Sequence, residues 1–389
     1  MHDPPTTFAV GHGSMMPETA VAGRLSAGGT LQSDLPVALY RGTAFIATTN
    51  RLQAVDTATG QITATVTPQG KPVGSGDGWA DTVLASAPVL ATARGTKTVI
   101  TPFVVRQTGT GTQADHAVVE VTGVNAATGK LIWQLTLRPP HWDDVYSDLR
   151  TSLVGAENGV AVVRVSTQSG DHAMAYGIDL DTSRQTWTID QFKAGAVAGG
   201  SVVGTALDDS VGVDQHPAGY DLTTGKLRWR GGHSTDVGAA PAGPHLVRVS
   251  GKDYDSGDAY DRLVDPGSGR TVQTMPTDLA SAGCTYDDRS TLVCSGTGAQ
   301  SQVAYALDAS TGKVLWQLPA QQADRIAPTV ATAWHGRVYG TTDHGPVALD
   351  ARTGKDLPNP GVAPYLVNES AGLALDKGGS NLIAYPTTS

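Results

Sequence analysis

Large apolar residues alternate with small or polar residues along much of the chain, and the stretch VAYALDASTGKVLW at 303–316 shows this pattern most clearly. Every second residue of VAYAL is large and apolar, and Val314 and Trp316 resume the alternation after a polar interruption. A period of two residues is typical of a half-buried β-strand. The interruption contains Asp308, whose carboxylate can accept backbone N–H groups, and Gly312, which can adopt a left-handed conformation. The stretch therefore predicts a β-hairpin.

The same polar turn recurs along the chain. It always begins with Asp or Asn, and the copies start at Asp56, Asn125, Asp179, Asp221, Asp265, Asp308 and Asp350. The fifth residue is Gly in every copy except the third, where Ser183 predicts a distorted or different turn. Eight residues after the start, four copies have tryptophan and the other three have Ala64, Gln273 and Pro358; the tryptophans are Trp133, Trp187, Trp229 and Trp316.

Successive turns are 69, 54, 42, 44, 43 and 42 residues apart. A repeat of this length that contains several strands is typical of a β-propeller blade. A single blade cannot bury both of its faces, so the blades must stack on one another around a ring. We expect the repeated tryptophan on the outer strand of its blade, wedged between that blade and the next.

The alternating strands, the D-x-x-T-G-K turn and the tryptophan resemble the repeats of the PQQ-like β-propeller superfamily, from about Leu35 to Tyr385. That superfamily includes quinoprotein alcohol dehydrogenases, the lipoprotein propeller of the outer-membrane β-barrel assembly machine, and extracytoplasmic sensor domains of bacterial membrane kinases. The resemblance implies a fold, an all-β propeller with four-stranded antiparallel blades. It leaves the function open, because the superfamily mixes enzymes, scaffolds and binders.

The ends of the chain determine the number of blades. The segment after the last turn, GVAPYLVNESAGLALDKGGSNLIAYP, supplies only three strands. We expect the stretch ETAVAGRLSAG at 18–28 to donate the fourth, which closes an eight-bladed ring and leaves no sheet edge unpaired. Residues 1–17 are then expected to be a flexible segment, and residues 18–389 a single, monomeric propeller domain.

Composition supports an all-β chain and limits the partners. The chain has 47 Gly, 22 Pro and 16% charged residues, with a net charge of −9. Lys and Arg are scattered without a basic run, which argues against nucleic acid as a partner. No apolar stretch is long enough to span a bilayer. The start, MHDPPTTFAVGHGSMM, lacks the features of a signal peptide. Either an export signal or membrane anchor is missing from this sequence, or the protein is cytoplasmic.

The two cysteines, Cys284 and Cys294, bear on this choice. They flank a predicted hairpin turn, and a register that places them opposite each other suits a cross-strand disulfide. The alternative is two reduced, buried thiols. We favour the disulfide, because no third cysteine or nearby histidine offers a metal site. A disulfide would indicate an oxidising, extracytoplasmic compartment, with the protein secreted or tethered to a membrane.

Motifs for phosphate or calcium are incomplete. Lys follows the turn Gly in several copies, but the next residue is never the Ser or Thr of a phosphate-binding loop. One acidic stretch, KDYDSGDAYD, loosely resembles a Ca²⁺ loop, although it lacks the Gly and Glu that such a loop requires. A solvated hairpin tip is the favoured interpretation and Ca²⁺ the alternative; the carboxylates are Asp253, Asp255, Asp258 and Asp261.

No set of nucleophile, base and orienting residue can be nominated from the sequence, so no catalytic or cofactor-binding residue is proposed. The most specific enzyme hypothesis is a diverged quinoprotein dehydrogenase that holds PQQ in the central funnel. Many of those enzymes carry a vicinal cysteine pair against the cofactor, whereas Cys284 and Cys294 are separated and lie in one hairpin. We therefore interpret the chain as a non-catalytic binding scaffold or sensor module, with a propeller enzyme as the alternative.

The connections between blades, and those between the two middle strands of each blade, share one rim and vary in length and sequence. Several carry aromatic, imidazole or carboxylate side chains, a composition typical of binding surfaces. We expect this rim to bind a protein, a glycan or a small molecule. The alternative for its tryptophans is that they fold down and cap their blades. The candidate residues are Trp79, His141, Trp142, Asp143, His233 and His344.

Overall fold

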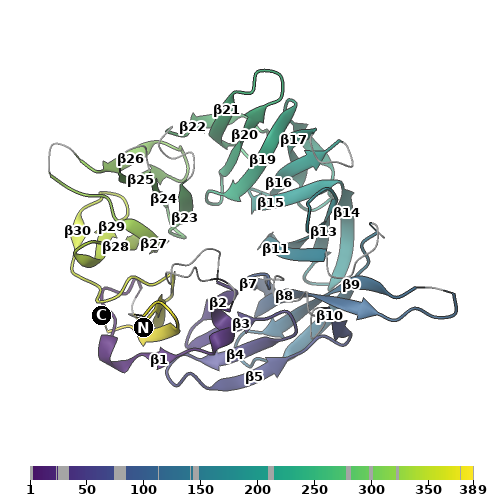
Figure 1. Ribbon diagram of the computed structural model, residues 1–389, viewed down its shortest axis with the longest axis horizontal. Helices are drawn as coiled ribbons and strands as arrows, with labels where there is room; N and C mark the ends of the chain where they lie inside the picture. Colours follow the sequence, from purple (N-terminus) through teal and green to yellow (C-terminus); the bar gives the residue numbers. More distant parts are fainter. Residues whose placement is uncertain are drawn as a thin grey trace.

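The structure is a computed structural model of the 389-residue chain. It describes residues 3–22, 24, 35–73, 85–112, 114–140, 142, 149–208, 214–276, 282–297, 301–320, 324–376 and 378–388. Antiparallel sheets follow one another around a central opening, which confirms the predicted all-β propeller (Figure 1). The helical elements among the described residues are two short 3-10 turns, Val10–His12 and Glu18–Ala20.

The described strands form eight four-stranded blades. Two of these blades join into one sheet through a single bridge between Gln215 and Ser234, at the junction of blades 4 and 5. The first strand of each blade faces the central opening and the last lies at the periphery (Figure 1).

From the inner to the outer strand, the first four blades have the following bounds. Blade 1 contains β2 (Val37–Tyr40), β3 (Thr43–Ala47), β4 (Leu52–Asp56) and β5 (Ile62–Val66). Blade 2 contains β7 (Val89–Ala93), β8 (Thr96–Gln107), β9 (His116–Asn125) and β10 (Leu131–Leu137), and the short β6 (Lys71–Pro72) also pairs with β8. Blade 3 contains β11 (Leu149–Glu157), β12 (Val160–Thr167), β13 (Ala173–Asp179) and β14 (Arg184–Asp190). Blade 4 contains β15 (Phe192–Ala198), β16 (Ser201–Leu207), β17 (Gln215–Asp221) and β18 (Leu227–Arg230).

The remaining blades follow the same order. Blade 5 contains β19 (Ser234–Pro241), β20 (Val247–Asp253), β21 (Ala259–Val264) and β22 (Thr271–Thr274). Blade 6 contains β23 (Gly283–Tyr286), β24 (Thr291–Thr297), β25 (Gln302–Asp308) and β26 (Val314–Leu318). Blade 7 contains β27 (Thr329–Trp334), β28 (Arg337–Thr342), β29 (Gly345–Asp350) and β30 (Asp356–Leu357). Blade 8 contains β31 (Leu366–Val367), β32 (Ala371–Leu375), β33 (Leu382–Pro386) and the N-terminal β1 (Ser14–Met15).

The repeated turns adopt the predicted geometry. The carboxylate of Asp308 accepts the backbone N–H groups of Ser310 and Thr311 at 3.1 and 3.0 Å, and Gly312 has a φ of 70°. Ser183, in the third copy, takes the same left-handed conformation with a φ of 55°, and Asp179 still accepts the N–H of Thr182. In the other six copies the backbone N–H of the fifth residue donates to the backbone oxygen of the turn Asp or Asn, whereas Ser183 and Asp179 do not form this bond. The third turn therefore keeps its Asp cap but differs from the other copies, as expected.

The repeated tryptophans lie between blades, as predicted. The indole ring of Trp187 lies over Gly177 of its own blade, and it also contacts Gly225 in the turn of blade 4; a Cβ on either glycine would come within 3 Å of the ring. The indole nitrogen donates to the backbone oxygen of Leu222, which follows the turn Asp of blade 4, at 2.8 Å. Trp229 and Trp316 make the same bond to Pro266 and Ala351.

Trp133 departs from this arrangement. Its ring lies over Gly123 of its own blade, as in the other copies. Its buried indole nitrogen, however, has no hydrogen-bond partner among the described residues. The turn of the following blade is the one that carries Ser183, so the missing bond coincides with the one turn whose fifth residue has a Cβ.

The ring closes through the N-terminus, but not through the segment that was expected. Strand β1 pairs with β33, with Ser14 opposite Ala384 and Met15 opposite Ile383, and the two chain ends lie side by side (Figure 1). The expected donor at 18–28 is wrong: Glu18–Ala20 forms a 3-10 turn, and residues 23 and 25–28 lie outside the described residues.

Residues 3–17, which were expected to form part of a flexible segment, pack against the propeller. Phe8 is only 5% exposed and lies in the apolar interface of blades 7 and 8, against Tyr339 at 5.8 Å between ring centroids. The hydroxyl of Tyr339 donates to the backbone oxygen of Pro5 at 2.6 Å. Blade 7 has Pro358 where blades 2, 3, 4 and 6 have tryptophan, so Phe8 supplies an aromatic ring that the repeat lacks there.

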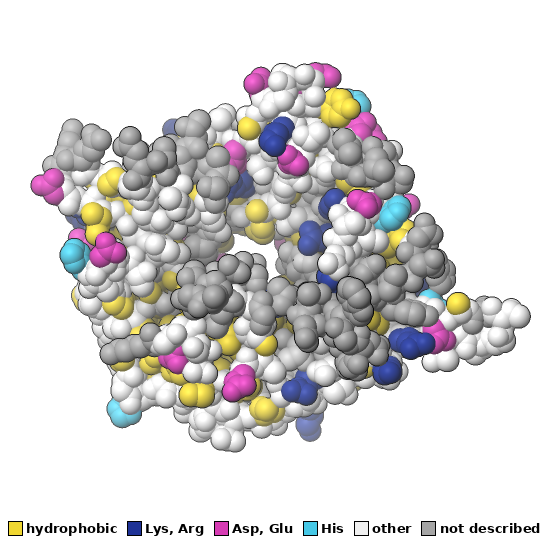
Figure 2. All heavy atoms as spheres, in the orientation of Figure 1, with side chains coloured by type: hydrophobic (Ala, Val, Ile, Leu, Met, Phe, Trp, Pro, Cys, Tyr) yellow, Lys and Arg dark blue, Asp and Glu magenta, His cyan; other side chains and the backbone are white. Residues whose placement is uncertain are grey.

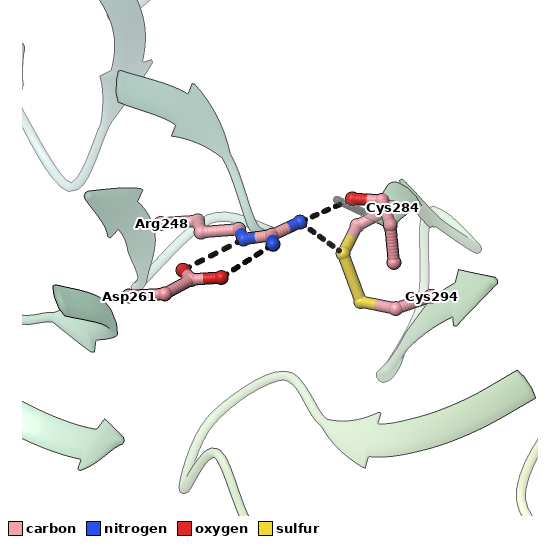
Figure 3. Close-up of a disulfide and its surroundings, with 5 residues drawn as sticks. Arg248, Asp261, Cys284 and Cys294 are labelled. Carbon is pink, nitrogen blue, oxygen red and sulfur yellow. Dashed lines mark hydrogen bonds and ion pairs between the residues drawn. A yellow bond between two sulfur atoms is a disulfide. The ribbon is translucent and has the colours of Figure 1, made fainter. Parts of the chain in front are cut away.

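The predicted disulfide is present. Cys284 on β23 lies opposite Cys294 on β24, in the register expected from the sequence. The guanidinium of Arg248, on β20 of the neighbouring blade, lies 3.3 Å from the sulfur of Cys284 and forms a two-fold ion pair with Asp261 (Figure 3). The disulfide therefore joins the two inner strands of blade 6, and Arg248 links it to blade 5.

Among the described residues, no helix has the length and apolar character needed to cross a membrane.

Candidate functional site

The two faces of the ring differ in how their polar groups are used. One face, here called the short-turn face, carries the seven Asp or Asn turns, whose carboxylate or amide oxygens accept N–H groups of their own turn. The opposite face, here called the loop-rich face, carries the connections between blades and those between the second and third strands of each blade. Only the loop-rich face has connections that vary widely in length and sequence, so we place the candidate site there. Figure 2 views the ring along the direction of Figure 1, and its centre is hollowed.

A buried carboxylate anchors the first long connection. Glu120, on β9, is 6% exposed and accepts the backbone N–H groups of Gln69 and Gly70 at 2.7 and 2.9 Å. The side-chain amide of Gln134 donates to the same carboxylate. Burying a carboxylate is costly unless it is hydrogen-bonded. Glu120 therefore fixes the base of the connection that leads to Trp79.

Trp142 is partly folded down on its blade. Its ring stacks on His172 at 5.8 Å between centroids, with an interplanar angle of 5°, and it contacts the apolar core of blades 2 and 3. His172 lies in the connection between β12 and β13, so a link between blades and a link within a blade meet here. Trp142 thus has a structural role on the loop-rich face, and its half-exposed ring remains accessible there.

A cluster of polar side chains lies where blades 4 and 5 meet. His233, in the link between these blades, has a 61% exposed side chain, and its Nδ1 lies 2.9 Å from the carboxylate of Asp214. His216, at the start of β17, is 5% exposed, and its ring lies 4.4 Å from that of His233 between centroids. The backbone N–H of Tyr254, from the hairpin tip of blade 5, donates to the oxygen of His233 at 3.2 Å. Two loops and one link therefore converge on His233.

Asp208 and Arg230 complete this cluster. Oδ2 of Asp208 lies 2.9 Å from Nε2 of His216, and its Oδ1 binds the guanidinium of Arg230. Burial raises the pKa of Asp208, but the hydrogen bond and charge of Arg230 and of His216 outweigh this, and the pKa lies below its ordinary value. Asp208 is therefore a stable anion beside His216.

The structure places the expected recognition residues in separate parts of the loop-rich face. His233 belongs to the cluster at blades 4 and 5, whereas His344 is an exposed residue at the hairpin tip between β28 and β29 of blade 7. Trp79, His141 and Asp143 lie outside the described residues. The proposed recognition role of all these residues stays a prediction.

The sequence did not single out Asp208, Asp214, His216 or Arg230. These four residues lie in two short stretches of the sequence, Asp208 to His216 and RWRGGH at 228–233. The signal could have been found only by noting that a strand start and the link to the next blade meet at the same rim.

The carboxylates considered for Ca²⁺ are already engaged in part. Asp261 is paired with Arg248, and Asp253 caps its own turn by accepting the N–H groups of Asp255 and Ser256. The side chains of Asp255 and Asp258 are exposed at the hairpin tip. This arrangement matches the solvated hairpin tip favoured above, and Ca²⁺ binding here is untested.

Comparison with known proteins yields a family, a relative that matches over a short stretch, and solved structures of similar fold. A family model described as outer membrane protein assembly factor BamB matches residues 24–231 and 258–357. The dehydrogenase subunit of a quinone-dependent alcohol dehydrogenase from Gluconobacter oxydans (strain 621H) is 51% identical over 59 residues. This similarity covers 13% of the present chain and 8% of that relative, so it spans only a small part of the relative's length.

Solved structures with a similar fold include the quinohemoprotein alcohol dehydrogenase ADHIIG from Pseudomonas putida HK5, with 11% identity and a TM-score of 0.48, covering 100% of this chain and 84% of that one. The Dos1 propeller has 10% identity and a TM-score of 0.47, covering 89% of this chain and 74% of that one. Because the family model matches well over half of the chain, the protein belongs to the family described as outer membrane protein assembly factor BamB, within the PQQ-like β-propeller superfamily.

Proposed function

We propose that this protein is a non-catalytic, extracytoplasmic scaffold that binds a protein partner through its loop-rich face. The observation that carries the proposal is the difference between the two faces. The turns of the short-turn face use their acceptors internally, whereas the loop-rich face offers exposed aromatic and imidazole groups such as Tyr254, 52% exposed, and His233. Such groups supply contact area and directional hydrogen bonds at protein interfaces.

The family description supports a protein as the partner, since an assembly factor acts on other proteins. The fold supports the same role, because a closed ring holds its loops on a rigid base. The disulfide between Cys284 and Cys294 supports an oxidising compartment.

A quinoprotein activity is the second candidate, and the local similarity to the alcohol dehydrogenase subunit favours it. That similarity extends over 59 residues, about the length of one blade repeat, and a shared repeat carries the fold rather than a site. The cysteines do not fit a cofactor seat, because they join two strands of one hairpin. Arg248, the cation beside them, already pairs with Asp261. No reaction step is therefore assigned to a quinone.

Site-directed photo-crosslinking in the producing cell tests the scaffold proposal. A photoreactive residue placed at Tyr254 or His344 reports on the loop-rich face, and the same residue at Thr223 or Arg352, both exposed, reports on the short-turn face. We expect adducts with one defined protein from the first pair of positions and none from the second. Adducts from the short-turn face alone, or alcohol-dependent dye reduction by purified protein supplied with PQQ and Ca²⁺, would overturn the proposal.

A further inference from the structure

The cluster at the junction of blades 4 and 5 brings three metal-ligating side chains together. One donor atom from each of Asp214, His216 and His233 lies within 4.8 Å of the other two. The backbone fixes this arrangement, because Gln215 and Ser234, the neighbours of the two histidines, form the bridge that joins the blades. The positions of the two imidazoles are therefore set by a strand pairing rather than by free loops.

The surroundings of His216 call for a cation at its Nε2. Its Nδ1 lies 3.0 Å from the backbone oxygen of Gly231, which only accepts hydrogen bonds, so Nδ1 carries the proton. A metal ion that binds His216 must therefore do so through Nε2. That atom faces carboxylate oxygens on two sides, at 2.9 Å from Asp208 and 3.7 Å from Asp214. A metal ion bound at Nε2 would therefore lie beside carboxylate oxygens, whose negative charge would stabilise it.

The same contacts resemble the outer shell of a metal site. A histidine that ligates a metal ion usually donates its other ring N–H to a carbonyl or carboxylate, which fixes its orientation and tautomer. Gly231 provides that acceptor for His216. Arg230 binds one oxygen of Asp208, so we place Asp208 beside the site and not among its ligands. Asp214 is the carboxylate that lies close to both imidazole rings.

The distances suit a small tetrahedral ion. Oδ1 of Asp214 lies 2.9 Å from Nδ1 of His233 and 3.7 Å from Nε2 of His216. Ligand atoms around a tetrahedral Zn²⁺, with bonds of about 2.0 to 2.2 Å, lie about 3.3 to 3.6 Å apart. Two imidazole nitrogens and one carboxylate oxygen are typical ligands of Zn²⁺ and related ions, whereas Ca²⁺ and Mg²⁺ prefer oxygen alone.

We propose that Asp214, His216 and His233 bind a divalent transition-metal ion of the Zn²⁺ class. The exposed side of His233 leaves the fourth coordination position open to solvent. The ion would fasten blade 4 to blade 5 on the loop-rich face, because its ligands come from β17, from the residue before it and from the link between the blades. This site does not depend on the proposed scaffold function.

Metal titration of the purified full chain, free of affinity tags and treated with chelator, tests the proposal. We expect calorimetry to show uptake of one Zn²⁺ per chain, and Co²⁺ to give the visible absorption of a tetrahedral site. The variants His233→Ala and Asp214→Asn alter exposed or half-exposed ligands and should weaken binding at least about tenfold. His344→Ala removes an exposed histidine elsewhere on the same face and should bind as the wild type does.

A thermal unfolding experiment provides a second readout. An ion that binds the folded state raises the melting temperature. We expect Zn²⁺ to raise it in the wild type and in His344→Ala, but not in His233→Ala. If the wild type takes up no Zn²⁺, the proposal is wrong. Equal uptake by the wild type, His233→Ala and Asp214→Asn would also overturn it.

Discussion

The indole nitrogen of Trp187 donates a hydrogen bond of 2.8 Å to the backbone oxygen of Leu222 in the next blade. The bond ties an outer strand to the residue that follows the neighbouring turn Asp, and the same bond recurs from Trp229 and Trp316. Each blade therefore helps to hold the turn of the next. Neighbouring blades are joined by specific hydrogen bonds as well as by apolar contact.

Replacing Trp187 with Phe removes this bond and leaves a buried carbonyl without its donor. We expect Trp187→Phe to cost about 1 to 3 kcal/mol of stability. Trp133→Phe is the matched control, because the indole nitrogen of Trp133 has no partner among the described residues and the substitution therefore breaks no hydrogen bond. Chemical denaturation of both variants measures the difference. Equal losses at the two positions would show that the hydrogen bond contributes nothing.

The fifth turn residue offers a reciprocal pair of substitutions. Gly225 has a φ of 67°, and a Cβ there would lie 2.8 Å from the Trp187 ring. We expect Gly225→Ser to destabilise by at least about 1 to 2 kcal/mol, the cost of a left-handed conformation for a residue with a Cβ. Ser183→Gly removes the same strain in blade 3, although the added freedom of the unfolded chain offsets part of the gain. Thermal midpoints should fall for the first variant and be unchanged or higher for the second; a fall for both would contradict this explanation.

The turn carboxylates make stability depend on acid. The hydroxyl of Ser310 and then the other donors of the turn lower the pKa of Asp308 to about 2, and the hydroxyl of Thr224 contributes most to lowering that of Asp221 to about 2. A carboxylate whose folded-state pKa lies below the unfolded value of about 3.9 stabilises the fold at higher pH. This contribution is lost as pH falls from about 4 to about 2.

Asp308→Asn separates this charge effect from the shape of the turn. Asn125 shows that an amide can cap the same turn through its oxygen. We therefore expect the variant to keep the fold and to lose less stability than the wild type between pH 4 and pH 2. Denaturation midpoints measured across this range provide the test. Parallel pH profiles for the two proteins would contradict the assigned role of Asp308.

The disulfide should be formed in the native protein. Mass spectrometry after alkylation without reductant is expected to find no modified cysteine, and two alkylated thiols would contradict the prediction. A loop closed between Cys284 and Cys294 is short, so reduction is expected to cost about 2 to 3 kcal/mol. The double variant Cys284→Ala with Cys294→Ala should show a similar loss and no further response to reductant.

Deletion of residues 1–16 should destabilise the whole ring. It removes β1, the partner of β33, and Phe8 from the interface of blades 7 and 8. Phe8→Ala isolates the second effect, and the loss of a buried aromatic ring is expected to cost about 3 to 5 kcal/mol. Val10→Ala is a suitable control, since Val10 is 48% exposed. Melting temperatures that are unchanged by the deletion would show that closure by β1 is dispensable.

The repeat allowed much of the fold to be predicted. Because Asp, Gly and Trp recur at fixed spacing, their turn and packing roles follow from local chemistry, and the cysteine register follows from hairpin symmetry. The position of β1 could not be predicted in this way. Residues Ser14 and Met15 carry no repeat signature, and only their contact with β33 makes them a strand.

The candidate site was harder to predict for a related reason. His233 stood out as a histidine in a varied connection, but its partners Asp214 and His216 belong to a different loop and strand. Their proximity depends on the bridge between Gln215 and Ser234, a contact between blades that leaves no pattern in either segment.

The pairing of Ser14 with Ala384 also sets a condition on how the protein is made. These residues are 370 positions apart, so β1 must wait unpaired on the growing chain until β33 has been synthesised. Contacts between such distant positions form late in folding. A chain that stops early leaves β1 without its partner and an open sheet edge in blade 8, which marks it for aggregation or proteolysis. Closure of the ring thus depends on synthesis of the whole propeller.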